Sequence, residues 1–416
     1  MRTSASAALV AAAALIAAGT LTGTASAAPL TADAGNGPLT AQPVPPGSGS
    51  LFDVTQAGAH VTFASGLNQR AVSEKVVRQS PLLLRKDDRD GKGWQAVALP
   101  SEGVGNGDNE INSTAAVPGT AGEAWAVGLE GRSTANCGFP PDFQVCGPIL
   151  ADHFDGTSWQ AEPVPTPANA EGGGLVQVAA SGPSDVWATG WLQIFDSGEP
   201  NPAKPGGWII QDHMEALVVH WDGHAWKRFP VPDALTYLPT SLVVSGHDVY
   251  TAGWGGDDVP VVQHWNGSTW TAEKLPDSYG GEVYGLGVDG TGSVWAVGRT
   301  LLTEDDPGHA LLLRRTGGVW REVPAPADAG QLTGIAFTPS GVAVAGSVVG
   351  GRDGYVAQSD ATGWHRLALP AAPEGGLVAT ESVSYSPRQG VTVVGHQEGP
   401  DGPFAGDAVP VVLAQR

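Results

Sequence analysis

The sequence contains few residues that suit thiolate metal sites, thiol chemistry or anionic partners. Its 416 residues include two Cys and six Lys, and the net charge is −21. Two cysteines without further ligands beside them do not suggest a metal site, and neither is spare for thiol catalysis. The negative charge disfavours nucleic-acid phosphates and anionic membrane surfaces as partners. We therefore expect no metal, no cofactor and no nucleic acid.

Long apolar runs are missing beyond the N-terminus. Arg2 is followed by an almost unbroken apolar run over 7–18, and Ala25-Ser26-Ala27 matches the small-x-small pattern of a cleavage site. The run is too short for a membrane span. Residues 1–27 are thus expected to be a signal peptide. Residues 28–416 are expected to form one secreted, extracellular domain without membrane insertion.

Secretion guides the expectation for Cys137 and Cys146, which lie nine positions apart in NCGFPPDFQVCG. An even number of cysteines in a secreted chain favours a disulfide, here one that closes a short loop. No catalytic or metal-binding role is expected for either cysteine.

Sequence motifs of common hydrolases are also missing. The chain carries no G-x-S-x-G elbow and no H-E-x-x-H motif, so an esterase nucleophile and a zinc protease have no support. Only 15 Arg are present, and few fall where a sialidase-type arginine cluster would need them. Carboxylate pairs that assemble only in space, as in glycoside hydrolases and polysaccharide lyases, remain an alternative.

The sequence shows an internal repeat and no helical periodicity. Six segments share an apolar run, a turn of Gly, Asp or Asn, and a Trp-started run ending at Pro, a pattern typical of a β-hairpin. The copies are LLLRKDDRDGKGWQAVALP (82–100), ILADHFDGTSWQAEPVPTP (149–167), ALVVHWDGHAWKRFPVP (216–232), PVVQHWNGSTWTAEKLP (260–276), ALLLRRTGGVWREVPAP (310–326) and GYVAQSDATGWHRLALP (354–370). The aligned tryptophans are Trp94, Trp159, Trp226, Trp270, Trp320 and Trp364.

A second hairpin precedes each copy, as in LVQVAASGPSDVWATGW (175–191). Each unit therefore has four short strands, a to d, and such units repeated at roughly 45 to 65 residues are typical of β-propeller blades. Seven a–b hairpins predict an all-β, seven-bladed propeller of four-stranded antiparallel blades. The expected blades lie at about 51–100, 110–167, 174–232, 240–276, 281–326, 331–370 and 377–416.

The seventh unit lacks its final strand, because the chain stops after AVPVVLAQR (408–416). Residues 38–46, PLTAQPVPP, match strand d of the second unit, QAEPVPTP. We therefore expect the N-terminal strand to complete the last blade, which removes an exposed sheet edge.

The stretch HWDGHAWKRFPVP (220–232) places His220, Asp222 and His224 within five positions, in the manner of a catalytic constellation. His153 and His264, however, stand at the same place in other repeats. A residue type that recurs around a ring is expected to serve packing or turn hydrogen bonds. Asp222 and its counterparts are expected to accept turn N–H groups, and the aligned aromatic rings to pack between blades.

The repeat also carries a family resemblance. SDVWATGW followed by LVVHWDGHAW resembles the tandem repeats of uncharacterised secreted bacterial propeller proteins. The DGTSW and NGSTW turns are similar to the Asp-box of sialidase-type propellers, in which the turn joins strands c and d and is structural. Here the box is one residue short and lacks its leading Ser. The resemblance implies the propeller architecture and brings no agreed activity with it.

Long b–c loops are expected on one rim of the propeller. They lie at 68–80, 130–147, 193–215, 301–309 and 397–407, whereas most a–b and c–d turns are short. Such loops on a rigid scaffold commonly carry function. Candidate binding residues on this rim are Phe139, Phe143, Trp191, Phe195, Trp208, Asp212, His213, Trp254, Asp257 and Asp258. Aromatic rings beside carboxylates suit sugars or proteins, although the rings could equally hold their own loops in place.

These patterns predict a secreted, monomeric, non-enzymatic propeller that binds an extracellular protein or a cell-wall glycan through the long-loop face. The alternative is a carbohydrate-active enzyme, a glycoside hydrolase or polysaccharide lyase, with acidic residues at the central mouth. A third hypothesis is a structural component of a secreted assembly.

Overall fold

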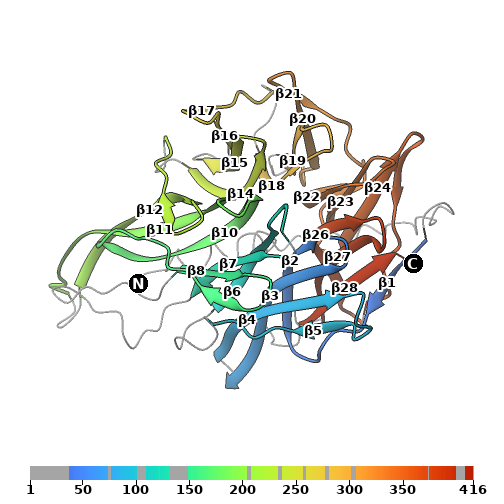
Figure 1. Cartoon of the computed structure of the whole chain (residues 1–416), viewed down its shortest axis with the longest axis horizontal. Coiled ribbons are helices and arrows are strands. Elements are labelled where there is room, and N and C mark those ends of the chain that lie inside the picture. Colours follow the sequence, from blue (N-terminus) through green and yellow to red (C-terminus); the bar gives the residue numbers. More distant parts are fainter. Residues whose placement is uncertain are drawn as a thin grey trace.

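Seven four-stranded antiparallel sheets surround a central axis in this chain (Figure 1). The computed structural model describes residues 37–73, 76–100, 109–120, 122–130, 149–203, 208–232, 237–255, 259–276, 281–300, 306–372, 374–399 and 408–415. All regular elements in these ranges are strands, as the repeat predicts. The protein is a seven-bladed β-propeller.

Within blades 1 to 6 the strands follow chain order from the inner strand a to the outer strand d. Blade 1 holds β2 (Gly49–Ala57), β3 (Val61–Ser73), β4 (Val76–Asp87) and β5 (Trp94–Ala96). Blade 2 holds β6 (Asn109–Ala116), β7 (Ala124–Glu130), β8 (Ile149–Phe154) and β9 (Trp159–Ala161). Blade 3 holds β10 (Ala170–Gly182), β11 (Asp185–Pro200), β12 (Trp208–Trp221) and β13 (Trp226–Arg228).

The other half of the ring follows the same plan. Blade 4 holds β14 (Tyr237–Ser245), β15 (Asp248–Gly255), β16 (Pro260–Trp265) and β17 (Trp270–Ala272). Blade 5 holds β18 (Gly281–Val288), β19 (Val294–Thr300), β20 (Ala310–Thr316) and β21 (Val319–Glu322). Blade 6 holds β22 (Ala329–Phe337), β23 (Val342–Val348), β24 (Gly354–Asp360) and β25 (Gly363–Arg366). Blade 7 holds β26 (Leu377–Ser386), β27 (Gly390–Glu398), β28 (Val409–Gln415) and β1 (Leu39–Gln42).

Blade 7 is built from both ends of the chain. The strand β1 pairs antiparallel with β28, from Leu39 opposite Gln415 to Gln42 opposite Val412. The predicted closure of the ring by an N-terminal strand is therefore confirmed.

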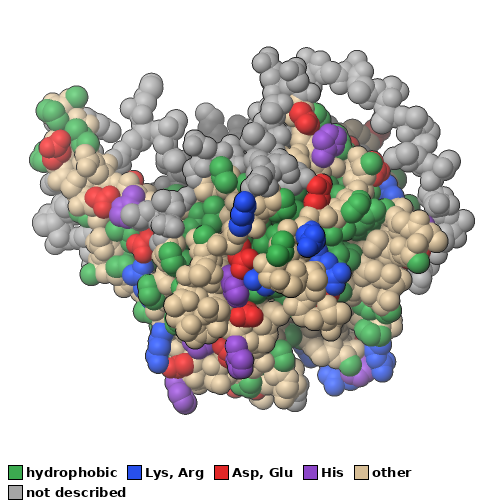
Figure 2. Space-filling view, turned by 90° about the horizontal axis from the view of Figure 1, so that it is seen from above, with side chains coloured by type: hydrophobic (Ala, Val, Ile, Leu, Met, Phe, Trp, Pro, Cys, Tyr) green, Lys and Arg blue, Asp and Glu red, His purple; other side chains and the backbone are tan. Residues whose placement is uncertain are grey.

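Two segments that the sequence predicts as loops are strands instead. Residues 68–73 and 76–80 continue the β3–β4 ladder, with Asn68 opposite Ser80. Residues 193–200 and 208–215 belong to β11 and β12, which pair from Val186–Trp221 out to Pro200–Trp208. Both extensions leave the same end of the ring, where strand b turns into strand c. We call residues 195–215, of which 195–203 and 208–215 are described, the blade-3 arm; it projects from the body of the propeller (Figure 2).

Each inner strand carries a β-bulge at the same place. The pairing of strand a with strand b shifts register in all seven blades. Following strand a along the chain, the residue just before the shift pairs with a glycine of strand b each time. These residues are Gly66, Gly128, Gly190, Gly253, Gly298, Gly346 and Gly395. A Cβ there would lie between 1.9 and 2.1 Å from a main-chain oxygen of strand a. The bulge brings that oxygen so close that only glycine fits.

Side chains at the bulge connect neighbouring blades. Between blades 4 and 5, the hydroxyl of Thr240 donates to the carbonyl of Val283 at 2.6 Å. The next residue, Ser241, accepts the N–H of Leu286 at 2.9 Å. Equivalent bonds join Asn112 to the carbonyl of Leu175, Thr333 to the carbonyl of Glu381, and the N–H of Val178 to Ser113. These bonds satisfy main-chain groups that the bulge withdraws from the sheet ladder.

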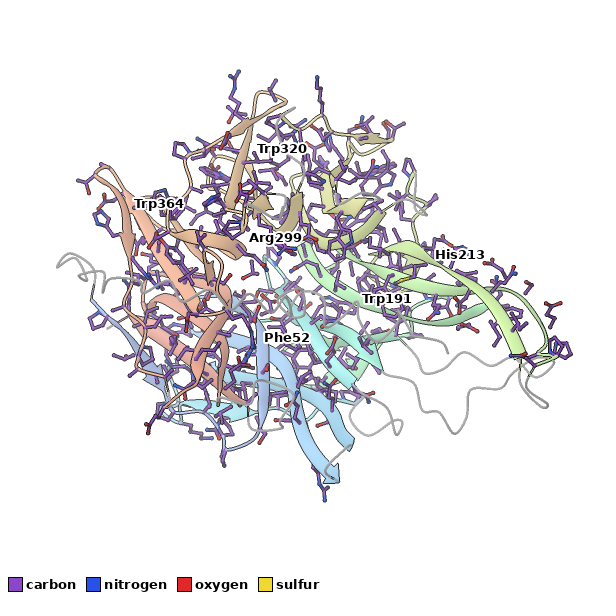
Figure 3. All side chains as sticks on the ribbon, turned by 180° about the vertical axis from the view of Figure 1, so that it is seen from behind. Phe52, Trp191, His213, Arg299, Trp320 and Trp364 are labelled. Atoms are coloured by element: carbon purple, nitrogen blue, oxygen red, sulfur yellow. The ribbon has the colours of Figure 1, made fainter. Side chains whose placement is uncertain are left out.

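In blade 1 a carboxylate occupies this connecting position. Asp53 accepts the N–H of Thr114 on blade 2 at 2.9 Å and the hydroxyl of Ser382 on blade 7 at 3.1 Å. Burial raises the pKa of Asp53, and the hydrogen bonds from Thr114, Ser382 and Ser113 oppose that rise. The preceding residue, Phe52, lies near the centre of the ring (Figure 3). Asp53 thus joins the first blade to both of its neighbours.

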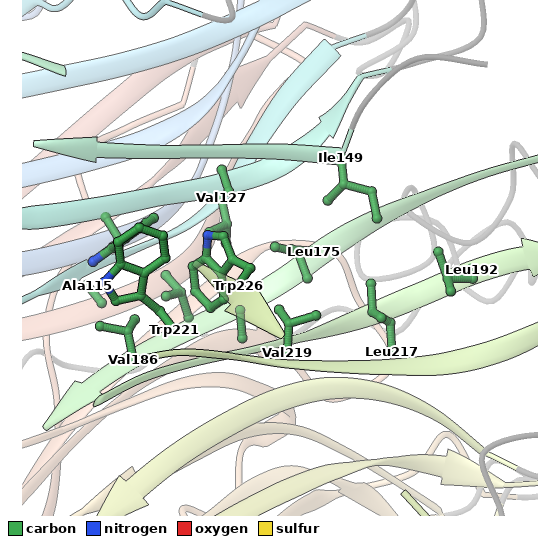
Figure 4. Packing of buried hydrophobic residues seen from close by; sticks show 14 of the residues in the cluster. Ala115, Val127, Ile149, Leu175, Val186, Leu192, Leu217, Val219, Trp221 and Trp226 are labelled. Carbon is green, nitrogen blue, oxygen red and sulfur yellow. The ribbon is translucent and has the colours of Figure 1, made fainter. Parts of the chain in front are cut away.

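The hydrophobic core is divided into seven clusters, one between each pair of neighbouring blades. Between blades 2 and 3, the rings of Trp221 and Trp226 lie 5.0 and 4.9 Å from that of Trp125. Figure 4 shows this packing, with Val127 beside the two labelled indoles. The aligned tryptophans therefore pack between blades as predicted. In blade 7, which has no strand-d Trp, Leu39 is 2% exposed and takes that position against blade 6.

Removal of β1 should destabilise the ring. A chain that starts at residue 49 leaves β28 with an open edge and removes Leu39 from its cluster, so the free energy of unfolding should fall by at least about 3 kcal/mol. Urea unfolding measures this, and a chain that starts at residue 37 is the matched control. Equal stability of the two truncated chains would contradict closure by β1.

Gly253→Ala should be among the most damaging small substitutions. Its new Cβ would meet the carbonyl oxygen of Leu238, whereas the same change at Gly182 meets nothing within 4 Å. We expect Gly253→Ala to cost about 3 kcal/mol of unfolding free energy and Gly182→Ala less than about 1 kcal/mol. Similar unfolding curves for the two variants would contradict the predicted overlap at position 253.

Candidate functional site

The histidine stretch of blade 3 lies at the turn end of the propeller, opposite the arm. His220 Nε2 lies 2.9 Å from Oδ1 of Asp185, and the indole of Trp187 donates to the same oxygen at 2.8 Å. The ring centroids of His220 and Trp187 lie 4.3 Å apart, and the ring planes are inclined at 32°. Asp222 instead accepts main-chain N–H groups of the c–d turn, including that of His224. The residues that resemble a catalytic trio therefore serve two separate structural roles.

Similar contacts between a strand-b aromatic ring and a strand-c side chain recur in other blades. They are formed by His153 on Trp125 in blade 2, His264 on Tyr250 in blade 4 and Arg314 on Trp295 in blade 5. In blade 5, Asp289 accepts bonds from both Arg314 and Trp295 at 2.9 Å. Burial would raise the pKa of Asp289, but hydrogen bonds from Thr291, Trp295 and the main chain outweigh it and lower this pKa to about 2. These contacts join strands b and c in blades 2 to 5.

The blade-3 arm is anchored where it leaves the ring. The N–H of Phe195 donates to the carbonyl of Asn169 at 2.8 Å, and the side-chain amide of Asn169 donates back to the carbonyl of Phe195 at 3.1 Å. Beyond this point the arm is a two-stranded ribbon, because β10 pairs with β11 only as far as Ile194. A ribbon with a fixed base presents its outer part at a defined place relative to the ring.

Three predicted binding residues meet on the arm. Phe195 and Asp212 are opposite each other in the β11–β12 ladder. His213, which is labelled in Figure 3, follows Asp212 on β12. His213 Nδ1 lies 2.8 Å from Asp196, and Gln193 donates to Asp212 at 3.0 Å. The surface of the arm is therefore polar and carries one aromatic ring.

Two further candidates lie in the body of the propeller. Trp191 and Trp254 hold the same position in blades 3 and 4, directly after the glycine that opposes the bulge. Trp191 is 9% exposed, so its ring belongs to the core. Trp254 is half-buried.

Several candidates lie outside the described residues. These are Phe139, Phe143, Asp257 and Asp258, and also Cys137 and Cys146 of the predicted disulfide. For Trp208 the strand is described but the side chain is not.

The sequence reasoning missed two acidic residues of the arm. Asp196 and Glu199 are exposed on β11, and Asp196 holds His213. β-Branched and aromatic residues at IF (194–195) and WII (208–210) favour strands and could have predicted them here. The Gly- and Pro-rich tip GEPNPAKPGG hides that signal.

Within the described residues, no group of three or more His, Cys, Asp and Glu side chains is placed to hold a metal ion. No helix in that part of the chain is long and apolar enough to cross a membrane.

Comparisons with known proteins show similarity in fold only. No protein-family model matches the chain, and no curated protein matches it significantly in sequence. A solved structure titled "YCF48 bound to D1 peptide" has a TM-score of 0.54 and 15% identity, over 92% of this chain and 96% of that one. "Structure of U3-55K" has a TM-score of 0.51 and 11% identity, over 92% and 99%. "Crystal structure of RRP9 WD40 repeats" has a TM-score of 0.50 and 12% identity, over 91% and 98%.

Acid should remove the contribution of Asp289 to stability. Its folded pKa of about 2 lies below the ordinary value of 3.8, so the ionised form stabilises the fold above pH 4. This stabilisation is lost as the pH falls from about 4 to about 2. Asp289→Asn should therefore lower the unfolding free energy at pH 7 and have a much smaller effect near pH 2, as urea unfolding can measure. An equal deficit at both pH values would refute the assignment.

Proposed function

We propose that the chain is a secreted, non-enzymatic binding protein that holds an extracellular protein partner on the face bearing the b–c hairpins. The observation that carries the proposal is the extension of two hairpins, β3–β4 and β11–β12, beyond the ring at the same end. A propeller needs neither extension to close its sheets. Conspicuous additions to a rigid scaffold are where binding commonly resides.

The form of these extensions favours a protein partner over a glycan. Paired strands are ordered before binding, so little conformational entropy is lost when a partner docks. The solved structure with 15% identity, titled as bound to a peptide, is a propeller of the same overall form.

Secretion is part of the proposal. It is supported by the charged start, apolar run and Ala25-Ser26-Ala27 pattern of the first 27 residues. The resemblance of the repeats to secreted bacterial propeller proteins points to the same location.

Shortening the arm should abolish partner capture without unfolding the ring. Replacing residues 195–212 by Asn-Gly joins Ile194 and His213, which are opposite each other in the ladder, through a two-residue turn. The mature protein, immobilised, would be incubated with culture supernatant and cell-wall extract of the source organism. Retained proteins would be identified by mass spectrometry, and stability checked by thermal melting.

A matched control carries His224→Ala, an exposed change in the c–d turn at the opposite end. We expect the same partner on the parent and on this control, and its loss on the shortened protein. Retention by the shortened protein would argue against the hairpin-bearing face. Turnover of a cell-wall polysaccharide by the parent would instead favour the carbohydrate-active alternative.

A further inference from the structure

The ring is closed between blades 7 and 1. At each of the other six junctions, strand d of one blade continues along the chain into strand a of the next. Between blades 7 and 1, the strand that leads into β2 is β1, which is held in blade 7 by its pairing with β28 (Figure 1). Blades 7 and 1 therefore stay together through noncovalent contacts alone.

At three junctions the side chain of the bulge residue, the strand-a residue left without a partner at the register shift, forms a hydrogen bond to the next blade. The donors are Asn112, Thr240 and Thr333, and the acceptors are the carbonyls of Leu175, Val283 and Glu381, at 2.9, 2.6 and 2.6 Å. Each acceptor lies at the bulge of the following blade. The bulge therefore directs this side chain to a main-chain carbonyl across the blade boundary.

The bulge residue of blade 7 is Glu381, on the strand that packs against β2. By the same geometry we expect its side chain to point to the bulge of β2, where Leu51 and Phe52 lie, the latter near the centre of the ring (Figure 3). A carboxylate has no proton to donate to a carbonyl there. Within the described part of the chain, the carboxylate of Glu381 forms neither a hydrogen bond nor an ion pair. In its ionised state the closing junction therefore lacks the bond that Asn112 forms between blades 2 and 3.

The other bulge residues cannot respond to acid in this way. Phe52 of blade 1 and Val176 of blade 3 have no polar side-chain atom, and Tyr284 of blade 5 donates to Glu282 of its own blade. Of the seven bulge residues, all of which are described, Glu381 is the one that becomes a donor by taking up a proton. Acid therefore changes this bulge contact and leaves the other six as they are.

The surroundings of Glu381 favour its protonated form. The side chain is half-buried but lies on an inner strand, so burial raises the pKa of Glu381, and the charge of His396 opposes that rise. The folded protein thus holds the proton more tightly than the unfolded chain, in which the pKa is about 4.5. The resulting stabilisation is fully present below that value and is lost as the pH rises through the higher folded pKa.

Other titratable groups lie on the strands around β26. They are Asp53 on β2, Tyr355 and Asp360 on β24, and His396 and Glu398 on β27, together with Tyr385 on β26 itself. Strands β22 and β23, which also pack against β26, carry none. All of these groups are retained when Glu381 is substituted. A comparison of variants at position 381 therefore isolates the effect of this carboxyl group.

We propose that Glu381 is an acid-operated latch at the closing junction: when protonated, its carboxyl O–H donates to the carbonyl of Leu51 or Phe52. The ionised form cannot make this bond, and it brings a negative charge close to a carbonyl oxygen that cannot neutralise it. Opening of the junction admits water, which solvates the carboxylate, so ionisation favours the open form. The ring is therefore closed more firmly in acid than above neutral pH.

Two substitutions at position 381 separate the hydrogen bond from the charge. Glu381→Gln carries an amide donor at every pH, as Asn112 does, whereas Glu381→Met has a similar length and no donor. Glu374→Gln removes an exposed carboxylate shortly before β26 and is the matched control. Melting temperatures would be measured between about pH 5 and about pH 8. Hydrogen–deuterium exchange at about pH 8 would compare β2 and β26 with β14 on the far side of the ring.

We expect Glu381→Gln to melt at least about 2 °C above the parent at about pH 8, with a difference that shrinks toward about pH 5. Glu381→Met should melt below Glu381→Gln at every pH, because it lacks the donor. Glu374→Gln should differ from the parent by a similar amount throughout. In Glu381→Gln, exchange of β2 and β26 should slow at least about threefold, while that of β14 stays unchanged.

Other outcomes overturn the latch. Equal melting of Glu381→Gln and Glu381→Met at every pH would show that no bond forms. A constant difference between Glu381→Gln and the parent would show that Glu381 does not titrate in this range. Exchange that slows equally in β14 would place the effect outside the closing junction. If neither variant folds, the parent decides: protection of β2 relative to β14 should fall between about pH 5 and about pH 8, and a constant ratio would exclude the latch.

Discussion

The architecture of this propeller depends on a close approach between the main chains of strands a and b in each blade. In every blade the inner strand bulges, and a strand-a oxygen comes so near to strand b that a Cβ there would overlap it. Seven glycines meet this requirement, one on strand b of each blade. The bulge bends the inner strand and increases its twist, which suits strands that crowd around an axis.

The bulge also determines how the blades are connected. It withdraws main-chain groups from the ladder. Side chains such as those of Thr240, Ser241 and Asp53 form hydrogen bonds with main-chain groups across the blade boundary. Outside this polar ring, aromatic residues fill each boundary with a separate hydrophobic cluster. Side-chain hydrogen bonds join blades 1 and 2, 2 and 3, 4 and 5, 6 and 7, and 7 and 1, and hydrophobic packing acts on all seven interfaces. No blade is held only by its own sheet.

The sequence allowed much of this architecture to be predicted, and its limits have physical causes. The Trp-started strands recur at aligned positions because every blade fills the same gap, so the repeat predicted seven blades and their closure. It also showed that His220 is one of a series. The arm was predicted as a loop because the Gly and Pro residues of its tip outweigh the few β-branched and aromatic residues of its strands. The replacement of a strand-d Trp by Leu39 became recognisable only from the register of β1 with β28.

The pairing of β1 with β28 sets the order in which the molecule can fold. Most of the ladders join strands close in sequence, whereas the hydroxyl of Thr40 bonds to the carbonyl of Ala414, 374 positions away. Contacts between such distant parts of a chain form slowly, because the intervening segment must first become compact. During translation the first strand must therefore remain unpaired until the last strand emerges. Until then the ring is an open arc with an exposed sheet edge, and completion of the seventh blade ends its period of greatest vulnerability to aggregation.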